Sequence, residues 1–387
     1  MEFFGFHRKN GEVGARNFVA VIPSVVCAND VADAIVRAVD NTRGYFHHQG
    51  CCQLPPDLDR VTESLINLGL SPNVGAALIV SLGCEGTDTE RLYDAIAASG
   101  KPTAIVRIQE LGGFSPAIAA GIDEARRLAM EIAPLQRQKA SLSQIMMSIK
   151  CGASDATSGL ASNCVIGYVA DKLVDLGATV VFGETTEFLG AEHILARRAR
   201  TPQVGRRIYD IVSCMEERAK SLGCDMRRGQ PTPGNIAGGL STIEEKSLGA
   251  IAKSGSRPIE GVLEYAERIN GRSGLWIKDT PGREPEILTG MATTGAQCML
   301  FSTGRGAPQG FPTMPVIKIC GNSNTYERMS HDMDLNAGCI IDGTKSIEEV
   351  GEEAFALLLR VLNGAITKNE AIGYFHNIDI YTLGPVI

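Results

Sequence analysis

Short apolar runs alternate with amphipathic segments along most of the chain. The apolar runs have the length of buried strands and fall at residues 18–26, 76–82, 103–108, 145–149, 179–182, 297–301 and 315–319. Segments such as residues 90–98, 165–176 and 347–362 place apolar residues near every third or fourth position, which is the spacing of an amphipathic helix. This alternation predicts an α/β protein with mainly parallel sheets.

A long helical pattern at residues 115–133 is followed by Pro134, where a helix would end. We interpret it as the bridge between two Rossmann-like α/β domains, residues 1–134 and 135–387. A chain of 387 residues has the length of two domains, at roughly 100–200 residues each.

Most of the predicted strands end in polar loops. The first run is followed by Asn29, which could cap a helix over residues 30–39, and the run at 76–82 is followed by Glu85. The run at 145–149 leads into Lys150-Cys-Gly-Ala-Ser-Asp, and the run at 179–182 leads into Gly183-Glu-Thr-Thr-Glu. Ligands of open α/β sheets bind beside the carboxyl ends of the strands. We therefore expect the active site there, between the two domains.

Charge and composition exclude several classes of partner. A formal net charge of −7 is unsuited to nucleic acid, which needs a basic surface. The sequence contains neither an apolar run long enough to span a membrane nor the layout of a signal peptide, so we expect a cytoplasmic protein. The eleven cysteines show no C-x-x-C spacing and favour free thiols. Six of them are predicted to be small buried side chains: Cys164, Cys214, Cys224, Cys298, Cys320 and Cys339.

The polar loops suit removal of a proton next to a carboxylate. The sequence lacks a nucleophile elbow, a phosphate loop, a zinc-protease motif and a dinucleotide fingerprint. Proton abstraction beside a carboxylate needs a base and a cation that stabilises the enolate. The oxygen and imidazole donors suited to Fe2+, Mn2+ or Mg2+ are Glu85, Glu184, Glu187, Glu192, His47 and His193. Lys150, Lys246 and Arg305 could bind a substrate carboxylate, and a desolvated Lys150 could act as the base.

Structural alternatives remain open for several of these residues. Glu192 and His193 also fit the first turn of a helix over residues 191–198, where a carboxylate is favourable. Ser241 or Thr242 with the following glutamates is also a capping box for a helix that begins at residue 243. An iron–sulfur cluster on Cys27, Cys51 and Cys84 is the alternative to a single metal ion.

Three motifs occur together in this chain. They are Lys150-Cys-Gly-x-Ser-Asp-x-Thr-Ser-Gly, Gly183-Glu-Thr-x-Glu-x-x-Gly-Ala-Glu-His and Gly234-Asn-x-x-Gly-Gly-Leu-Ser-Thr-Ile-Glu-Glu-Lys. They resemble the altronate/galactarate dehydratase family, which also includes the large subunit of sulfolactate sulfo-lyase. The likeness continues at Gly11-x-Val-Gly-x-Arg-Asn17, His47-x-x-Gly-Cys51, Gly83-Cys-Glu85, Thr303-Gly-Arg-Gly306 and Lys318-x-x-Gly-Asn322.

The resemblance implies an iron- or manganese-dependent lyase that eliminates the group β to the carboxylate of a hydroxy acid. The product would be a 2-keto-3-deoxy acid or, from sulfolactate, pyruvate and sulfite. On the matched motifs, the expected catalytic residues are Lys150, His47, His193, Glu184 and Lys246. The expected substrate-binding residues are Arg16, Asn17, Ser154, Asp155, Thr157, Thr185, Asn235, Thr303, Arg305 and Asn322. The expected metal ligands are His47, Cys51, Glu85 and Glu192, with Fe2+ preferred over Mn2+ or Mg2+.

The resemblance also bears on partners and substrate. Sugar-acid dehydratases of this family carry a small β-rich domain ahead of the region matched here. We therefore expect a separate small subunit, in a homo-oligomer or hetero-oligomer. Sugar-acid members carry cysteines at the positions of Cys51 and Cys84 and the sulfo-lyase subunit lacks them, which favours a sugar acid such as altronate or galactarate. The alternatives are the sulfo-lyase large subunit and a non-catalytic sugar-acid-binding protein.

Overall fold

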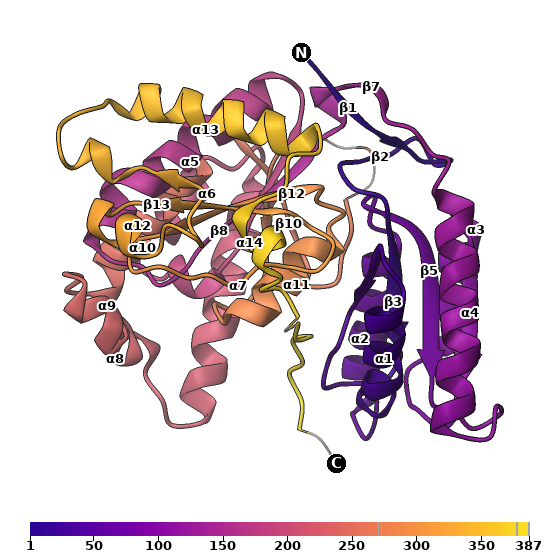
Figure 1. Ribbon diagram of the computed structural model, residues 1–387. Helices are drawn as coiled ribbons and strands as arrows, with labels where there is room; N and C mark the ends of the chain where they lie inside the picture. The colour runs from indigo at the N-terminus through magenta and orange to yellow at the C-terminus, as the bar shows by residue number, and fades with distance from the viewer. Residues whose placement is uncertain (270, 272, 377, 386–387) are drawn as a thin grey trace.

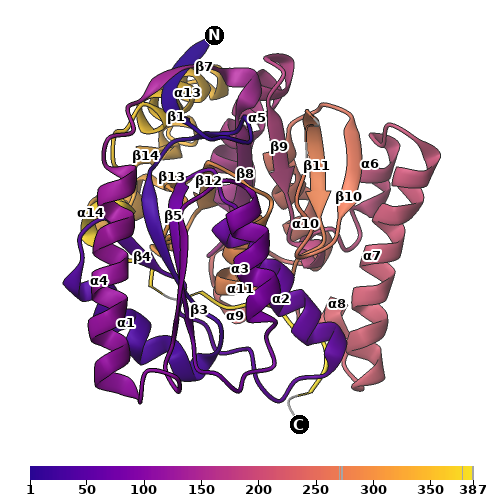
Figure 2. The same cartoon turned by 90° about the vertical axis from the view of Figure 1, so that its right-hand side faces the viewer.

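The computed structural model describes residues 1–269, 271, 273–376 and 378–385. Its helices surround two parallel sheets, one of four strands and one of seven, and a three-stranded sheet lies at one end (Figures 1 and 2). The prediction of an α/β protein with mainly parallel sheets is confirmed. The Rossmann-like domain arrangement, and with it the division at residue 134, remains a prediction.

The four-stranded sheet lies in the first third of the chain. Its order is β4 (Thr42–Gly44), β3 (Phe18–Pro23), β5 (Val74–Ser81) and β6 (Thr103–Arg107), all parallel. Helices α1 (Asn29–Ala38) and α4 (Phe114–Ile132) pack on one face, and α2 (Pro55–Gly69) and α3 (Thr89–Ala98) pack on the other. Val19 and Val21 point to the first face, and Ala20 and Ile22 point to the second. A strand that is covered on both faces has a continuous run of apolar residues in the sequence, as β3 and β5 do.

The seven-stranded sheet is also entirely parallel. Its order is β10 (Ile259–Leu263), β11 (Gly274–Lys278), β9 (Thr179–Phe182), β8 (Met146–Cys151), β12 (Cys298–Thr303), β13 (Val316–Cys320) and β14 (Leu335–Asn336). One face packs against α5 (Asn163–Asp175), α6 (Glu192–Arg197), α7 (Pro202–Ser221), α10 (Ile243–Ile251) and α13 (Ile347–Leu362). The other face packs against α11 (Glu284–Thr293), which also contacts α2. One apolar core therefore joins the two parallel sheets.

The segments at both ends of the chain contact parts of the protein that are distant in the sequence. The N-terminal strand β1 (Glu2–His7) pairs antiparallel with β2 (Val13–Gly14) and with β7 (Gln138–Ser141). The C-terminal segment descends between the two larger parts (Figure 1), where Ile378 and Ile380 join the shared apolar core. The carboxylate of Asp57 on α2 accepts hydrogen bonds from the backbone N–H groups of Leu383 and Gly384, at 2.9 and 2.6 Å. The short helices are α8 (Met226–Gly229), α9 (Pro233–Ala237), α12 (Ser323–Arg328) and α14 (Lys368–Ile372).

Several local predictions need correction. The first strand ends at Pro23. Asn29 is the first residue of α1 rather than its cap, because residues 26–28 already form a helical turn and Asn29 itself has helical dihedral angles, φ −58° and ψ −43°. Cys214 and Cys224 are exposed, whereas Cys298 and Cys320 are buried as predicted and Cys164 and Cys339 are half-buried. Among the described residues, no helix is both long and apolar enough to cross a membrane.

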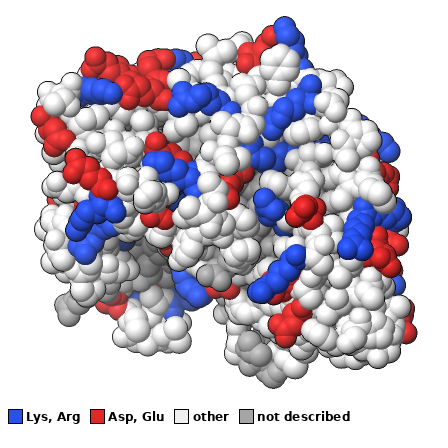
Figure 3. All heavy atoms as spheres, in the orientation of Figure 1, with Lys and Arg blue, Asp and Glu red and all other residues white. Residues whose placement is uncertain are grey.

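Charged side chains of both signs are interspersed over the molecular face in Figure 3. The surface ion pairs of the protein include Lys172 with Glu352 and Arg200 with Glu260. Pairs of this kind contribute little to stability. Ion pairs inside the protein therefore carry more information about a functional site.

Candidate functional site

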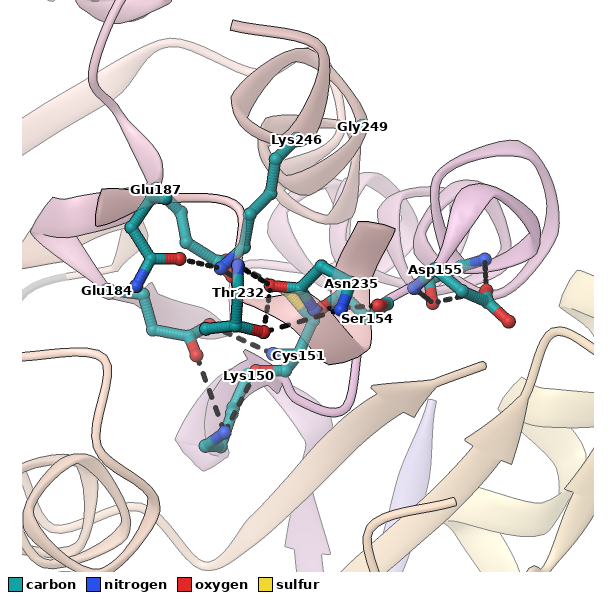
Figure 4. A network of polar contacts seen from close by, with 12 residues as sticks. Lys150, Cys151, Ser154, Asp155, Glu184, Glu187, Thr232, Asn235, Lys246 and Gly249 are labelled. Carbon is teal, nitrogen blue, oxygen red and sulfur yellow. Dashed lines mark hydrogen bonds and ion pairs between the residues drawn. The ribbon is translucent and has the colours of Figure 1, made fainter. Parts of the chain in front are cut away.

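Two neighbouring strands deliver the central polar residues to one sheet edge. Strands β8 and β9 are parallel, and Ile149 lies opposite Phe182, so Lys150 and Cys151 lie beside the turn that carries Glu184 (Figure 4). Glu184 adopts a left-handed backbone conformation, with φ 71° and ψ 62°. Such a conformation is unfavourable for a residue other than glycine and persists only where other contacts hold it. Here the Cys151 N–H donates to Glu184 Oε2 at 2.9 Å, and the Glu184 N–H donates to Thr280 Oγ1 at 2.8 Å.

The ammonium of Lys253 lies among two carboxylates and a thiol. Lys253 belongs to the short turn that follows α10 and is 0% exposed. Its Nζ lies 2.6 Å from Glu184 Oε2, 2.8 Å from Glu187 Oε2 and 3.1 Å from Cys151 Sγ. The Cys151 thiol also donates to Glu187 Oε2 at 2.8 Å. A buried charge must be paired and hydrogen-bonded to be tolerated, and this arrangement provides both.

Lys150 joins a third carboxylate, that of Glu284, to the same group. Its ammonium lies 3.4 Å from Glu184 Oε1 and 3.3 Å from Glu284 Oε1, and it donates to the Cys151 carbonyl at 2.8 Å. It also lies 4.4 Å from the centroid of the Phe301 ring on β12, a cation–π contact. Lys150 is 0% exposed, whereas the Glu284 side chain is 29% exposed. Glu284 therefore marks the side on which solvent reaches the cluster.

The environment shifts the acidities of the two central carboxyls in opposite directions. Burial and the adjacent charge of Glu187 raise the pKa of Glu184, and this exceeds the opposing effect of Lys253 and Lys150. Burial would also raise the pKa of Glu187, but the charges of Lys253 and Lys246 and the Cys151 hydrogen bond lower it to about 2. Burial would lower the pKa of Lys150, but the charges of Glu184 and Glu284 outweigh it and raise that pKa. Opposite shifts in neighbouring titratable groups are typical of sites with separate acid and base roles.

Three of these side chains could hold a metal ion. Ligand atoms of Cys151, Glu184 and Glu187 lie within 4.8 Å of one another, and all three residues are buried. A thiolate with two carboxylates suits a borderline divalent ion. However, the Lys253 ammonium already lies among all three, at 2.6–3.1 Å. The group therefore does not fit a divalent ion unless Lys253 moves.

A second set of predicted residues lies next to this cluster. The side-chain amide of Asn235 donates to the Ser154 carbonyl at 2.8 Å, and Arg305 donates to the Gly234 carbonyl at 2.9 Å. Asp155 Oδ1 accepts a hydrogen bond from Thr157 at 2.7 Å. The backbone of Gly304, after Thr303, lies so close that a Cβ there would come within 1.8 Å of Asp155 Oδ1. The structure thus brings together the loops at 153–158, 232–235 and 303–305.

Other residues predicted to bind substrate have side chains that contact other parts of the fold. Arg16 forms a salt bridge with Glu370 at 2.8 Å and donates to nearby carbonyls. Asn17 donates to the Ile132 carbonyl and Asn322 caps α12. Thr185 donates to Asp279 at 2.6 Å. Lys246 lies at the edge of the cluster, 3.8 Å from Glu187 Oε1 and 3.0 Å from Gln230 Oε1.

The four predicted metal ligands do not converge. His47 Nε2 hydrogen-bonds the Pro23 carbonyl at 2.7 Å, its Nδ1 accepts from the Gln49 N–H, and burial lowers its pKa to about 4. Glu85 accepts hydrogen bonds from Ser24, Ser81 and the Gly83 N–H. Cys51 is exposed. Among the described residues, these side chains and Glu192 do not form a group with ligand atoms within 4.8 Å. The predicted catalytic residue His193 is exposed on α6.

Sequence reasoning missed two residues of the cluster. Lys253 and Glu284 lie outside the three motifs, and neither precedes or follows a strand that was predicted. Glu187 was considered only as a metal donor, although it lies in the second motif. The available signal for Lys253 was its position shortly after the helix predicted from residue 243.

The sequence of the chain matches the models of a known family over nearly its whole length. A family model described as "D-galactarate/Altronate dehydratase, C-terminal" matches residues 142–386, and one described as "D-galactarate dehydratase/Altronate hydrolase, second domain" matches residues 5–133. The chain therefore belongs to the D-galactarate/altronate dehydratase family, as its motifs indicated.

The named relatives of this chain indicate the kind of enzyme to which it is similar. The chain is 38% identical to the (2R)-sulfolactate sulfo-lyase subunit beta of Chromohalobacter salexigens, over 96% of this chain and 95% of that protein. It is 33% identical to the galactarate dehydratase (L-threo-forming) of Escherichia coli, over 99% of this chain and 77% of that protein. It is 31% identical to the altronate dehydratase of Bacillus subtilis, over 100% of this chain and 78% of that protein. These relatives are lyases and dehydratases, which supports an enzyme of the lyase kind.

Proposed function

We propose that this protein is a lyase that removes the C2 proton of a 2-hydroxy acid and expels the group on C3. The first candidate reaction is dehydration of a sugar acid such as altronate or galactarate to a 2-keto-3-deoxy acid. The observation that carries this proposal is the buried pair of Glu184 and Glu187, whose pKa values shift in opposite directions around one ammonium. A carboxylate with raised pKa is suited to accept a proton near neutral pH.

The roles follow from the chemistry of the intermediate. Removing a proton beside a carboxylate gives a dianionic enolate, which nearby positive charge stabilises. We assign Glu184 as the proton acceptor and Lys150 as the cation that holds the substrate carboxylate. Lys246, at the edge of the cluster, would contact the hydroxyl groups. The other bases predicted from sequence, His47 and His193, are less suited, because His47 is hydrogen-bonded at both ring nitrogens and His193 is exposed.

Metal dependence is part of the proposal, with Fe2+ preferred over Mn2+ or Mg2+. Because Lys253 lies among the ligand atoms of Cys151, Glu184 and Glu187, we route no step through an ion at that position. Treatment with a chelator should abolish activity, and re-addition of Fe2+ or Mn2+ should restore it. Full activity after exhaustive chelation would remove the metal from the mechanism.

The second candidate is the elimination of sulfite from sulfolactate. The relative named as subunit beta of the sulfo-lyase has a higher identity than the dehydratases above, and nearly its whole length is matched. Against it, Lys150 and Lys253 already pair with carboxylates, so the cluster offers hydrogen bonds rather than excess positive charge. Such a site suits the hydroxyls of a sugar acid with one carboxylate, such as altronate, better than a substrate with a second anionic group, such as sulfolactate or galactarate.

A partner subunit belongs to the proposal as well. The name "subunit beta" of one relative implies a further subunit in that enzyme. We propose that this chain also acts with a separate small subunit, in an oligomer. Its location in the cytoplasm remains an expectation.

A substrate panel tests the proposal. Aldonates, aldarates and sulfolactate would be incubated with the protein, its small partner and Fe2+ or Mn2+ under anaerobic conditions, and keto acid and sulfite would be measured. Keto acid without sulfite supports the dehydratase, and sulfite release supports the second candidate. Ligand binding measured by calorimetry with no turnover of any substrate would favour a non-catalytic sugar-acid-binding protein and contradict the proposal.

A further inference from the structure

Three free thiols follow three adjacent strands of the four-stranded sheet. Cys27 follows β3, Cys51 lies in the loop after β4, and Cys84 follows β5, and these strands are neighbours in the order β4-β3-β5. All three side chains are exposed, as is Cys52, whereas Cys151, Cys298 and Cys320 are buried. Exposed cysteines at strand ends cannot be explained as core packing.

Backbone hydrogen bonds hold the three loops together next to each thiol. The N–H of Val26, before Cys27, donates to the Gln49 carbonyl at 2.9 Å. The N–H of Gly86 donates to the Gly50 carbonyl, just before Cys51, also at 2.9 Å. Each cysteine therefore lies within two residues of a hydrogen bond to another of the three loops.

The loop geometry depends on a glycine. Gly50 has φ 106°, and a Cβ at this position would lie 2.5 Å from the Ser24 carbonyl oxygen. The loop before Cys51 thus rests directly on the end of β3, which no other residue type would allow. On the β5 side, the side-chain amide of Gln109 donates to Cys84 Sγ at 3.4 Å. Hydrogen bonds to sulfur are one of the means by which proteins tune iron–sulfur clusters.

The spacing of these thiols argues against a single ion. Ligands of one tetrahedral ion lie about 2.3 Å from the metal and so are close to one another. Apart from Cys151, Glu184 and Glu187, the described part of the chain has no three Cys, His, Asp or Glu side chains with ligand atoms within 4.8 Å of one another. A cluster of several iron and sulfide ions binds each thiolate through a different iron, so its cysteines are farther apart.

We propose that Cys27, Cys51 and Cys84 bind an iron–sulfur cluster at the carboxyl edge of the four-stranded sheet. Each thiol loses its proton as its sulfur bonds to iron, and iron and sulfide are supplied as such. With three cysteine ligands, one iron keeps an open position that a hydroxy acid could occupy as a ligand.

The cluster would lie on the side of the fold that carries the lyase site. The loop of Cys51 includes His48, whose Nδ1 lies 2.8 Å from Asp379 Oδ1. Asp379 also pairs with Arg283 at 3.0 Å, and the next residue, Glu284, contacts Lys150 at 3.3 Å. Only the catalytic role of the cluster rests on the proposed function, because its presence is measurable without turnover.

The test is anaerobic reconstitution of the full-length protein with ferrous iron and sulfide. We expect iron and acid-labile sulfide in similar amounts, with visible absorption that bleaches on reduction. Cys27→Ser, Cys51→Ser and Cys84→Ser should each reduce bound sulfide at least tenfold, whereas Cys214→Ser, at another exposed cysteine, should keep it. Circular dichroism of each variant checks the fold.

Thiol alkylation gives a measurement that needs no variant. Reconstitution should protect Cys27, Cys51 and Cys84 from iodoacetamide and leave Cys214 and Cys224 reactive. Iron or zinc bound without sulfide, or sulfide retained in the three serine variants, would overturn the proposal. Loss of the cluster in Cys52→Ser would overturn the assignment of three ligands. Lys150→Met should keep the cluster, so failure of the lyase proposal is distinguishable from failure of this one.

Discussion

Replacing Lys253 with methionine should destabilise the fold through charge rather than through packing. Methionine has a similar length and fills the apolar part of the space, but it cannot neutralise Glu184 and Glu187, which lie 2.6 and 2.8 Å from the ammonium. Removing one partner of a buried ion pair costs about 3–5 kcal/mol. We expect the free energy of unfolding, measured in urea at neutral pH, to fall by about this amount.

The loss should depend on pH in a defined direction. In the wild-type protein, the pKa of Glu187 is about 2, below its unfolded value of about 4.3. Its stabilising contribution is therefore present above the unfolded pKa and lost as the pH falls through about 2. In the variant, both carboxyls lose their nearest cation and keep only the more distant Lys150 and Lys246, at 3.4 and 3.8 Å, so we expect their folded pKa values to rise above the unfolded value. Their protonated forms then favour folding, so the deficit relative to wild type should shrink as the pH is lowered from about 8 toward 5.

Two controls separate charge from packing. The double variant Lys253→Met/Glu187→Gln removes one stranded carboxylate and should be more stable than Lys253→Met alone. Mn2+ should stabilise Lys253→Met more than it stabilises the wild type, because the ammonium no longer lies among Cys151, Glu184 and Glu187. A deficit below about 1 kcal/mol, or one that grows as the pH falls, would refute the reasoning.

The remaining predictions concern activity. Lys150→Met should lower turnover at least ~10²-fold. If Lys150 only binds the substrate carboxylate, hydrogen–deuterium exchange at the substrate C2 should persist in this variant at saturating substrate. Near-wild-type turnover would remove Lys150 from the mechanism. Glu184→Gln should abolish that exchange, and unchanged exchange would contradict its assignment as the base. Arg16→Met should lower the free energy of unfolding by about 3 kcal/mol and leave KM unchanged, because Arg16 is buried against Glu370. A tenfold higher KM with a normal free energy of unfolding would instead support a role of Arg16 in substrate binding.

The sequence predicted elements well where the apolar pattern along the chain is strong. The strand at 179–182 and the helix at 347–362 have the predicted bounds, because each shows an uninterrupted apolar run or a strong 3.6-residue period. Strands β10 and β11 were missed. They contain Glu260, Gly261 and Lys278, and their place in the sheet depends on pairing with distant β9. The pattern of apolar and polar residues within a short segment carries no information about pairing with a distant strand.

Some residues of the candidate site could be predicted from the sequence, and others could not. Lys150 lies near the end of β8, Glu184 follows β9, and both belong to clear motifs, so the sequence alone indicated them. Lys253 lies 69 residues from Glu184 in the chain, in a turn where a lysine is ordinarily solvated. Only the packing of α10 and its following turn against the edge of the seven-stranded sheet makes it the central cation of the cluster.

Glu184 combines three unfavourable features at one position. It is buried, its backbone is left-handed, and a second carboxylate lies next to it. A left-handed residue other than glycine costs about 1–3 kcal/mol, so glycine here would remove the strain and the buried charge together. Instead, Lys253, Lys150, the Cys151 N–H and Thr280 all compensate this one residue. So many compensating contacts around one carboxyl argue for a group whose proton affinity is set for chemistry, rather than for a structural ion pair.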